Sequence, residues 1–326
     1  IFLPICFLLH WYVFARNLRA RNAFILFISY IFYGWWDWRY LALIIFCSLV
    51  AFICGILIHT AGTQRLRKLY LTISIVVPLS VLVVFKYYDF FVTSLVQAVG
   101  SVGIDLDLRL LHVLLPVGIS FYTFQALSYT TDIYRREIQP TRDLITFLAF
   151  KAFFPQLVAG PIERATNLLP QFKVLQPFDR TKAYDGMRQM LWGLFKKVVV
   201  ADTCAIHVNA IFADHEHLPS ATLLLGAVLF AIQIYGDFSG YSDIAIGCAR
   251  LFGFSLMRNF AFPYFSRDMA EFWRRWHISL STWFRDYVYV PLGGSRGTVA
   301  ASVRNTFIIF IVSGFWHGAN WTFIIW

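Results

Sequence analysis

Long apolar runs separated by short charged clusters restrict this chain to a small set of folds. Residues 40–58 contain no charged side chain, and residues 23–36 and 69–88 form comparable runs on either side. A helix rises ~1.5 Å per residue, so runs of this length can cross the ~30 Å hydrocarbon core of a bilayer. Of the 326 residues, 59% are hydrophobic and only 14% are charged, too few charges to cover a soluble domain of this size. The sequence therefore predicts an all-α, polytopic membrane protein.

The positions of the basic residues predict how the chain threads the bilayer. Arginines and lysines gather in three clusters beside the apolar runs, as they do in the cytoplasmic loops of membrane proteins. An even number of runs separates successive clusters, so all three can lie on the cytoplasmic side. The predicted spans are 1–14, 23–36, 40–58, 69–88 and 111–131, with cytoplasmic clusters at 16–21, 65–68 and 135–136 and with residues 89–109 outside.

The pattern changes after Arg142. Residues 144–164 are apolar but contain Lys151, Pro155 and Pro161. Such an interrupted stretch is tolerated at membrane depth only where protein or a water-filled cavity surrounds it, so we predict a broken or re-entrant helix. The predicted order beyond it is a cytoplasmic segment 165–189, a span 190–212, an outside loop 214–219, a span 220–236 and a final span 306–326.

The absence of an internal repeat or linker predicts a single membrane domain, residues 1–326. Ile1 is not a start methionine, and Trp326 ends inside an apolar run. We therefore expect the chain to be trimmed at both ends, with an incomplete C-terminus.

Charge and cysteine content argue against several other classes of protein. The net charge of +10 comes from clusters beside apolar runs rather than from a free basic stripe, so nucleic-acid binding is not predicted. The five cysteines form no CxxC pair and predict neither a disulfide framework nor a metal site. The sequence contains no glycine-rich phosphate loop or dinucleotide fingerprint, so no permanently bound cofactor is expected.

One candidate for chemistry is His317, in the final apolar run. An ionisable side chain there is costly and marks either a function or a buried polar partner. On a continuous helix, Ser313 at i−4 and Asn320 at i+3 would share its face and hydrogen-bond to its ring. Gly314 and Gly318 form a small-xxx-small pair, which allows another backbone to approach closely. The alternative is a structural histidine that packs a helix seam.

The other candidate is His277, in a stretch rich in arginine and tryptophan at 272–294. Helical spacing predicts that Arg274 and Ser281 flank it, and a Pro-x-Gly-Gly turn ends the helix. Arg274 and Arg275 could hold an anionic, phosphorylated acyl carrier. An interfacial amphipathic helix with an incidental histidine is the alternative.

The sequence offers two candidate histidines but no group of metal ligands and no recognisable serine or cysteine nucleophile. This combination favours one reaction. A neutral histidine can take a proton from a hydroxyl as that oxygen attacks an activated carbonyl. Acyl transfer from a thioester to an alcohol is the reaction most consistent with these parts.

Four stretches resemble the membrane-bound O-acyltransferase (MBOAT) family. The likeness is strongest to its bacterial branch of alginate O-acetyltransferases and peptidoglycan or cellulose acetylation proteins. The run "YVPLGGSRG" favours this branch over the related D-alanyl transfer protein of teichoic acid synthesis. The four stretches, in the family's order, are "FFPQLVAGPIER" (153–164), "DFSGYSDIAIG" (237–247), "EFWRRWHISLSTWFRDYVYVPLGGSRG" (271–297) and "GFWHGANW" (314–321).

The resemblance implies a fold and a site. The fold is a curved ring of transmembrane helices with re-entrant segments around a central tunnel. His317, in the Trp-His-Gly motif, is implied to be the catalytic histidine. His277 is implied to be the second one, on the cytoplasmic side. Around them, Arg274, Arg275, Ser313 and Asn320 are the predicted substrate-binding residues.

The resemblance also implies a reaction and its partners. An acyl group, most simply acetyl, would pass from acyl-CoA or another cytoplasmic thioester toward a hydroxyl acceptor for modification of an exported polysaccharide. The expected partners are this donor, the lipid bilayer, the polysaccharide and an extracytoplasmic relay or acceptor protein. The expected location is the bacterial inner membrane, crossed several times.

Three other functions stay open at this point. The first is D-alanyl-type transfer to a cell-wall polymer. The second is a transporter whose intramembrane histidines relay protons. Such transporters usually show paired broken helices in two corresponding halves, whereas one broken segment without a partner occurs here. The third is a non-catalytic membrane scaffold for a polysaccharide machine.

Overall fold

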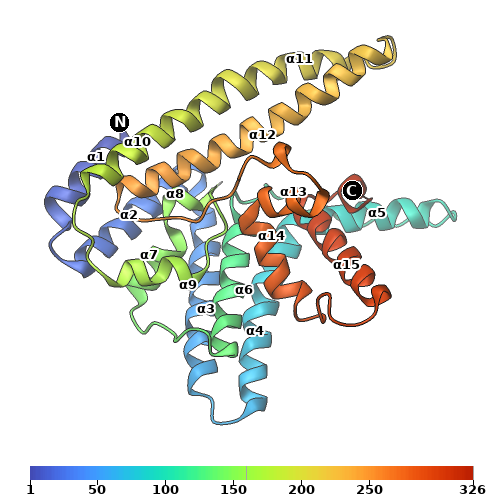
Figure 1. Cartoon of the computed structure of the whole chain (residues 1–326). Helices are drawn as coiled ribbons and strands as arrows, with labels where there is room; N and C mark the ends of the chain where they lie inside the picture. Colours follow the sequence, from blue (N-terminus) through green and yellow to red (C-terminus); the bar gives the residue numbers. More distant parts are fainter. Residues whose placement is uncertain (159, 326) are drawn as a thin grey trace. The chain divides into compact units, whose positions relative to one another are not determined.

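The computed structural model describes residues 1–158 and 160–325, and every regular element within them is helical (Figure 1). This confirms the predicted all-α class. The chain divides into two compact units, and each is described by itself. The first unit comprises Ile1–Ser29, Phe153–Glu163 and Asn167–Ser281, and the second comprises Tyr30–Ala152, Arg164–Thr166 and Thr282–Trp326. The single domain and the ring with its tunnel stay predictions.

Four helical stretches of the described chain are long and apolar enough to cross a membrane. The predicted spans 23–36 and 40–58 lie in the first of them, separated by the turn at Trp38–Tyr40. Asp37 makes this break because its carboxylate accepts the Arg39 N–H at 3.0 Å. The four stretches are Leu18–Thr60, Gln64–Gly100, Ser220–Leu251 and Val299–His317, and a shorter apolar helix covers Phe2–Phe14.

The second unit is built around helix α6, most of whose side chains are buried. Its predicted start at 111 was wrong, because helix begins only at Ile119, after Gly118 turns the chain with a φ of 75°. A positive φ is a conformation that glycine adopts without strain. The helices packed together here are α3 (Leu41–Thr60), α4 (Gln64–Leu82), α6 (Ile119–Arg135) and α7 (Leu144–Ala152) (Figure 1).

The segment predicted to lie outside, 89–109, is partly helical. Helix α4 continues through the π-helical turn η3 (Val83–Tyr87) into α5 (Tyr88–Gly100). Asp89 lies in the first turn of α5, where an acidic side chain is favourable. Its carboxylate accepts the N–H groups of Leu111 and His112 at 2.8 and 2.9 Å, which holds the returning chain against the helix.

Two long helical rods dominate the first unit. Helices α10 (Arg180–Leu194), η5 (Phe195–Ala201) and α11 (Asp202–Ala213) follow one another without a loop, and α12 (Ser220–Leu251) runs back along them (Figure 1). The predicted spans 190–212 and 220–236 fall inside these rods, but their ends were wrong. Helix α12 continues past 236 through residues 237–243 to Leu251.

Glycines allow the two rods to touch. A Cβ on Gly240 would lie 2.7 Å from the Gly193 carbonyl oxygen, and one on Gly193 would lie 2.6 Å from the Gly240 oxygen. About two turns further along α12, Gly247 lies against Gly186 of α10 in the same way. The backbones therefore meet directly, as small residues allow at membrane helix interfaces.

The predicted break within 144–164 is confirmed. Helix α7 ends at Ala152, and the short α8 (Phe154–Leu157) follows with Pro155 in its first turn, where proline is tolerated. Whether this segment is re-entrant stays a prediction. The remaining short elements of the first unit are α1 (Phe2–Leu9), η1 (His10–Phe14), η4 (Leu169–Lys173) and η6 (Pro263–Phe265). Helices α2 (Leu18–Asp37) and α9 (Ala165–Leu168) are divided between the two units.

Both histidine-bearing stretches are broken where a continuous helix was predicted. The first contains α13 (Met269–Arg275), α14 (Ile278–Phe284) and the π-helical η7 (Arg285–Tyr289). The second contains α15 (Val299–His317) and the short α16 (Trp321–Ile325). The predicted final span 306–326 therefore does not form one helix, and its last residue lies outside the described residues.

Candidate functional site

His317 is the last residue of α15 and belongs to the second unit. Helix stops there because Gly318 is extended, with φ −167° and ψ 154°. The side chain of His317 lies at the surface of the described chain. Its ring lies edge-on to Trp316, with centroids 4.6 Å apart. The structure thus presents His317 at a helix end rather than halfway along a span.

Of the two residues predicted to share a helix face with His317, one lies on the same helix and the other does not. Ser313 stays on α15, one turn before the histidine. Asn320 does not share that helix face, because the helix has ended. Its Oδ1 instead accepts the N–H of Thr322 at 3.0 Å and begins α16. The sequence could not distinguish an Asn that follows His317 on a helix from one that starts a new helix.

The small-residue pair beside His317 has the predicted effect. A Cβ on Gly314 would overlap the carbonyl oxygen of Phe323, and one on Gly318 would overlap the ring of Phe323. The approaching backbone is that of α16, from the same chain. The glycines therefore let α16 fold back against the end of α15 that carries the histidine.

Two residues of η3 hold this end of α15, and the sequence analysis missed both. The Tyr87 hydroxyl donates to the Phe315 carbonyl, and the Lys86 ammonium donates to the Trp316 carbonyl. Lys86 also donates to the Ser120 hydroxyl at 3.4 Å. The last carbonyls of a helix lack partners within it and carry partial negative charge, so a cation and a hydroxyl donor are favourable there. Lys86 within the predicted span 69–88 was the available signal.

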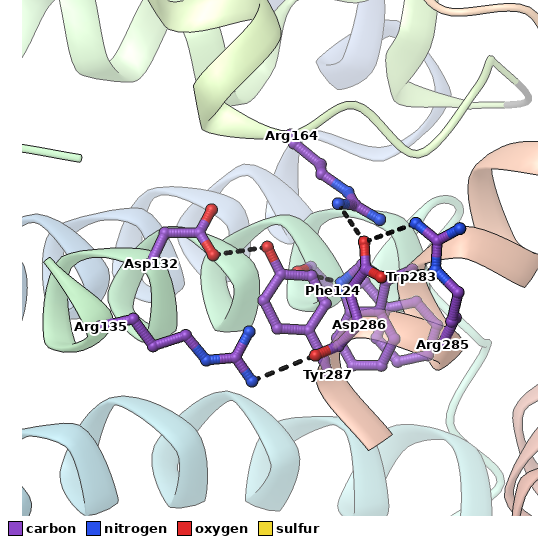
Figure 2. Close-up of polar contacts among 8 residues, drawn as sticks. All are labelled: Phe124, Asp132, Arg135, Arg164, Trp283, Arg285, Asp286 and Tyr287. Atoms are coloured by element: carbon purple, nitrogen blue, oxygen red, sulfur yellow. Dashed lines mark hydrogen bonds and ion pairs between the residues drawn. The ribbon is translucent and has the colours of Figure 1, made fainter. Parts of the chain in front are cut away.

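A column of stacked rings leads away from Trp316. Its ring lies 5.9 Å from Phe124 at an interplanar angle of 15°, and Phe124 stacks on Trp283 at 4.1 Å and 17°. The Trp283 indole N–H donates to the Phe124 carbonyl at 3.2 Å, and the Tyr287 ring follows at 5.0 Å (Figure 2). Residues 283–287 are thereby packed against α6 and connected to the neighbour of His317.

A carboxylate fixes the far end of this column. Asp286 forms ion pairs with Arg164 at 2.5 Å and with Arg285 at 2.7 Å (Figure 2). Burial raises the pKa of Asp286, but hydrogen bonds from Arg285 and Arg164 outweigh burial and hold it below its usual value. The aspartate is therefore ionised at neutral pH and binds two separate segments together.

Tyr287 is held from three directions. Its hydroxyl donates to Asp132 Oδ1 at 2.6 Å. The guanidinium groups of Arg135 and Arg164 lie 5.3 and 5.4 Å from its ring centroid, within the range of a cation–π contact (Figure 2). Arg135 also donates to the Asp286 carbonyl at 3.1 Å. This network anchors the turn after α14 to the end of α6.

His277 belongs to the first unit and lies at a break between α13 and α14. Its backbone has a φ of +42°, which is uncommon for a residue with a side chain. The side chain is 2% exposed and packs edge-on against Phe238, with centroids 4.6 Å apart. The prediction that Arg274 shares a helix face with His277 was wrong, because α13 ends at Arg275. Ser281 keeps its predicted i+4 relation, since its N–H donates to the His277 carbonyl at 2.9 Å.

Asn259 holds this break, and no sequence signal had singled it out. Its carbonyl accepts the Ile278 N–H at 2.8 Å, and its side-chain oxygen accepts the Ser279 hydroxyl at 2.9 Å. Its amide donates to Ser242 on α12 at 3.1 Å, while the Ser279 oxygen accepts the Ile162 N–H at 3.0 Å. Three of the four family-like stretches therefore meet around one buried asparagine.

The two predicted donor-binding arginines lie in different surroundings. Arg275 pairs with buried Glu271 at 2.5 Å, and Glu271 also pairs with Arg267 at 3.1 Å. The Arg267 N–H and then its guanidinium lower the pKa of Glu271 to about 2, so this carboxylate is ionised. Arg274 is exposed. Arg275 is thus partly neutralised within the protein, and Arg274 presents the freer charge.

Comparison with known proteins accounts for this combination of motifs. The family model of MBOAT, the membrane-bound O-acyltransferase family, matches residues 134–326. The chain belongs to this family. The matched region contains His277, His317 and η7, whereas Lys86, Tyr87 and the α6 partners Phe124 and Asp132 precede it.

Two similar proteins align over the whole of this chain and are themselves longer than it, and a third aligns over part of it. A probable alginate O-acetylase AlgI of Pseudomonas syringae pv. tomato is 44% identical over 330 residues, 100% of this chain and 62% of that protein. A peptidoglycan O-acetyltransferase of Helicobacter pylori is 33% identical over 100% of this chain and 66% of its own length. A teichoic acid D-alanyltransferase of Streptococcus thermophilus is 31% identical over 64% of this chain. The chain thus spans about three fifths of the first relative's length.

Proposed function

We propose that this protein is a membrane O-acyltransferase that moves an acyl group, acetyl in the simplest case, from a thioester to a hydroxyl used in polysaccharide modification. Family membership supports the reaction type, and two relatives that align over the whole chain, at 44% and 33% identity, are named for alginate and peptidoglycan acetylation. The observation that carries the proposal is the placement of His317. The side chain stands exposed at a helix end that Lys86 and Tyr87 hold in place.

The proposed reaction needs one proton acceptor. A neutral His317 ring takes the proton of the acceptor hydroxyl as its oxygen attacks the thioester carbonyl carbon. The new C–O bond forms, the C–S bond breaks, and the histidine returns the proton to the departing thiolate. Products are an ester and a free thiol, so the histidine ends as it began. The stacked rings from Trp316 to Tyr287 would hold the end of α15, which carries the histidine, in a fixed position.

The donor is proposed to arrive from the cytoplasm, as acyl-CoA or another acyl thioester. Arg274 is the better candidate for contact with its phosphates, because Arg275 is paired with Glu271. His277 is proposed as a residue that orients the donor side, and Ser313 as one near the acceptor path. Asn320 is retained as a candidate through its place at the start of α16, not through a shared helix face.

The proposed setting is the bacterial inner membrane, which the chain crosses several times. The segments expected outside are short, and an extracytoplasmic relay or acceptor protein would deliver the hydroxyl of the exported polysaccharide. D-alanyl transfer to a cell-wall polymer is the second candidate function, favoured by the 31% identity to a teichoic acid D-alanyltransferase. Its coverage of 64% of this chain, against 100% for the acetylation relatives, ranks it below acetyl transfer.

The test is acyl transfer by variants at matched membrane levels. His317→Ala and His317→Gln should each lower transfer by about 10²–10⁴-fold, because glutamine hydrogen-bonds but cannot accept the proton at neutral pH. His215→Ala changes an exposed histidine of the loop after α11 and should leave transfer unchanged. Parallel assays with acetyl and D-alanyl thioesters distinguish the two candidate functions. High activity of His317→Gln would refute the proposed role of this histidine.

A further inference from the structure

A polar cavity lies in the first unit, lined by α10, η5, α12 and the segment 256–262. Its volume is about 400 Å³, within the ~300–1,000 Å³ range of small-molecule sites. The α12 residues that line it recur at helical spacing on one face, from Tyr235 through Ser239 and Asp243 to Arg250. Neither candidate histidine is among its lining residues.

The cavity carries an excess of positive charge. Three lining residues are cationic, namely Lys196, Arg250 and Arg258, and one is acidic, Asp243. Lys196 and Asp243 neutralise each other in an ion pair of 2.5 Å. The two arginines remain as uncompensated charges of the lining. The Arg258 Nε donates to the Phe260 carbonyl at 2.5 Å, which orients its guanidinium group.

The side chain of Gln189, a half-buried residue of the cavity lining, still has hydrogen-bonding capacity. The Gln189 side-chain nitrogen donates to Asp243 at 2.8 Å. Its oxygen is buried and has no hydrogen-bond partner within the described residues. Burying a carbonyl oxygen without a donor is unfavourable, so the site is complete only when a ligand or solvent supplies an N–H or O–H. This requirement is independent of the charge excess.

These two observations define the chemistry of a ligand. The arginines favour a phosphate, whose oxygens match guanidinium geometry. The Gln189 oxygen favours a hydroxyl close to that phosphate. Arg250 lies in the last turn of α12, one of the four helices suited to cross a membrane. Basic pockets between transmembrane helices are places where phosphate headgroups bind.

We propose that this cavity binds a phosphate ester that carries hydroxyl groups, of the kind found in the glycerol phosphate headgroup of an anionic membrane lipid. The same chemistry is present in soluble glycerol phosphate. None of the residues proposed for acyl transfer lines the cavity, although Asn259 and Ser242, which hold the break at His277, do. The proposal does not depend on that function.

Binding is measured on the whole chain in lipid nanodiscs and in detergent. Phosphatidylglycerol and phosphatidylcholine are counted by native mass spectrometry, and sn-glycerol 3-phosphate is titrated by calorimetry. Arg250→Gln with Arg258→Gln should weaken phosphatidylglycerol binding roughly tenfold or more, since two charge-assisted contacts are lost. Arg188→Gln removes an exposed arginine of α10 outside the cavity and should change nothing.

A gain of affinity separates this proposal from damage to the fold. Asp243→Asn removes the carboxylate that neutralises Lys196, so it should tighten phosphate binding severalfold. Binding of the lipid alone assigns the site to a headgroup, and equal binding of glycerol phosphate assigns it to a soluble phosphate ester. Equal retention of phosphatidylglycerol and phosphatidylcholine, together with no response to glycerol phosphate in any variant, would overturn the proposal.

Discussion

At the scale of single residues, Arg274 and Arg275 are neighbours with different expected roles. Arg274→Ala should raise the apparent KM for the acyl donor, because its exposed charge is the one available to phosphate. Arg275→Ala should instead loosen the segment 267–277 and leave the KM of the remaining folded protein near its normal value, since its partner is Glu271. Steady-state kinetics and hydrogen exchange over this segment make the comparison.

Lysine substitution serves as the control for this pair. Arg274→Lys keeps the charge and should recover part of the donor affinity, although lysine cannot form a bidentate contact. If Arg275→Ala raised KM while Arg274→Ala did not, the assignment of donor contact to Arg274 would be wrong.

The residue types at the candidate site could be predicted from the sequence, but their backbone setting could not. Nothing between Trp273 and Leu280 signals a helix break, because no glycine or proline is present. The break at His277 depends on Asn259, a residue far along the chain whose hydrogen bonds replace those of the helix. Long-range partners of this kind leave no local pattern.

At the scale of elements, the seam between α10 and α12 depends on glycine. Gly240→Leu should lower the free energy of unfolding by about 1–3 kcal/mol or more, because a side chain there would meet the Gly193 carbonyl. Gly62→Ala is the matched control, since a Cβ at Gly62 meets nothing within 4 Å. Denaturation in mixed detergent micelles measures both. Equal stability of the two variants would show that the rods do not pack this closely.

Lys86 and Tyr87, which cap the C-terminal end of α15, give a second prediction at this scale. Tyr87→Phe removes only the hydroxyl that donates to the Phe315 carbonyl, and it should cost about 0.5–1.5 kcal/mol of stability. Lys86→Met removes the cation from the Trp316 carbonyl and should also reduce acyl transfer, since this end of α15 carries His317. The matched assays are detergent denaturation and acyl transfer. Full transfer by Lys86→Met would mean that the cap does not position the histidine.

Element boundaries were predicted well where a local signal existed. The turn at Asp37 and the break near Pro155 coincide with residues that end or start helices for known reasons. The prediction failed at 111–131. There, Gly118 starts the helix later than hydropathy suggests.

At the scale of the whole molecule, charge and hydropathy answer different questions. Hydropathy locates the apolar runs, and these contribute to the four stretches of the described chain that are long and apolar enough to cross a membrane. It cannot say which side each loop faces. Arginine and lysine clusters predict the side of each loop through the positive-inside bias.

The sidedness of two loops tests this threading. Glu216 lies in the loop between α11 and α12, expected outside, and Arg136 follows α6, expected inside; both are exposed, so labelling reports the side rather than burial. Replacing Cys204 by serine removes the one native cysteine that is not buried. In intact cells, Glu216→Cys should then react with a membrane-impermeant thiol reagent and Arg136→Cys should not, whereas both should react after permeabilisation. The reverse pattern would invert the threading, and with it the side from which Arg274 could meet a cytoplasmic donor.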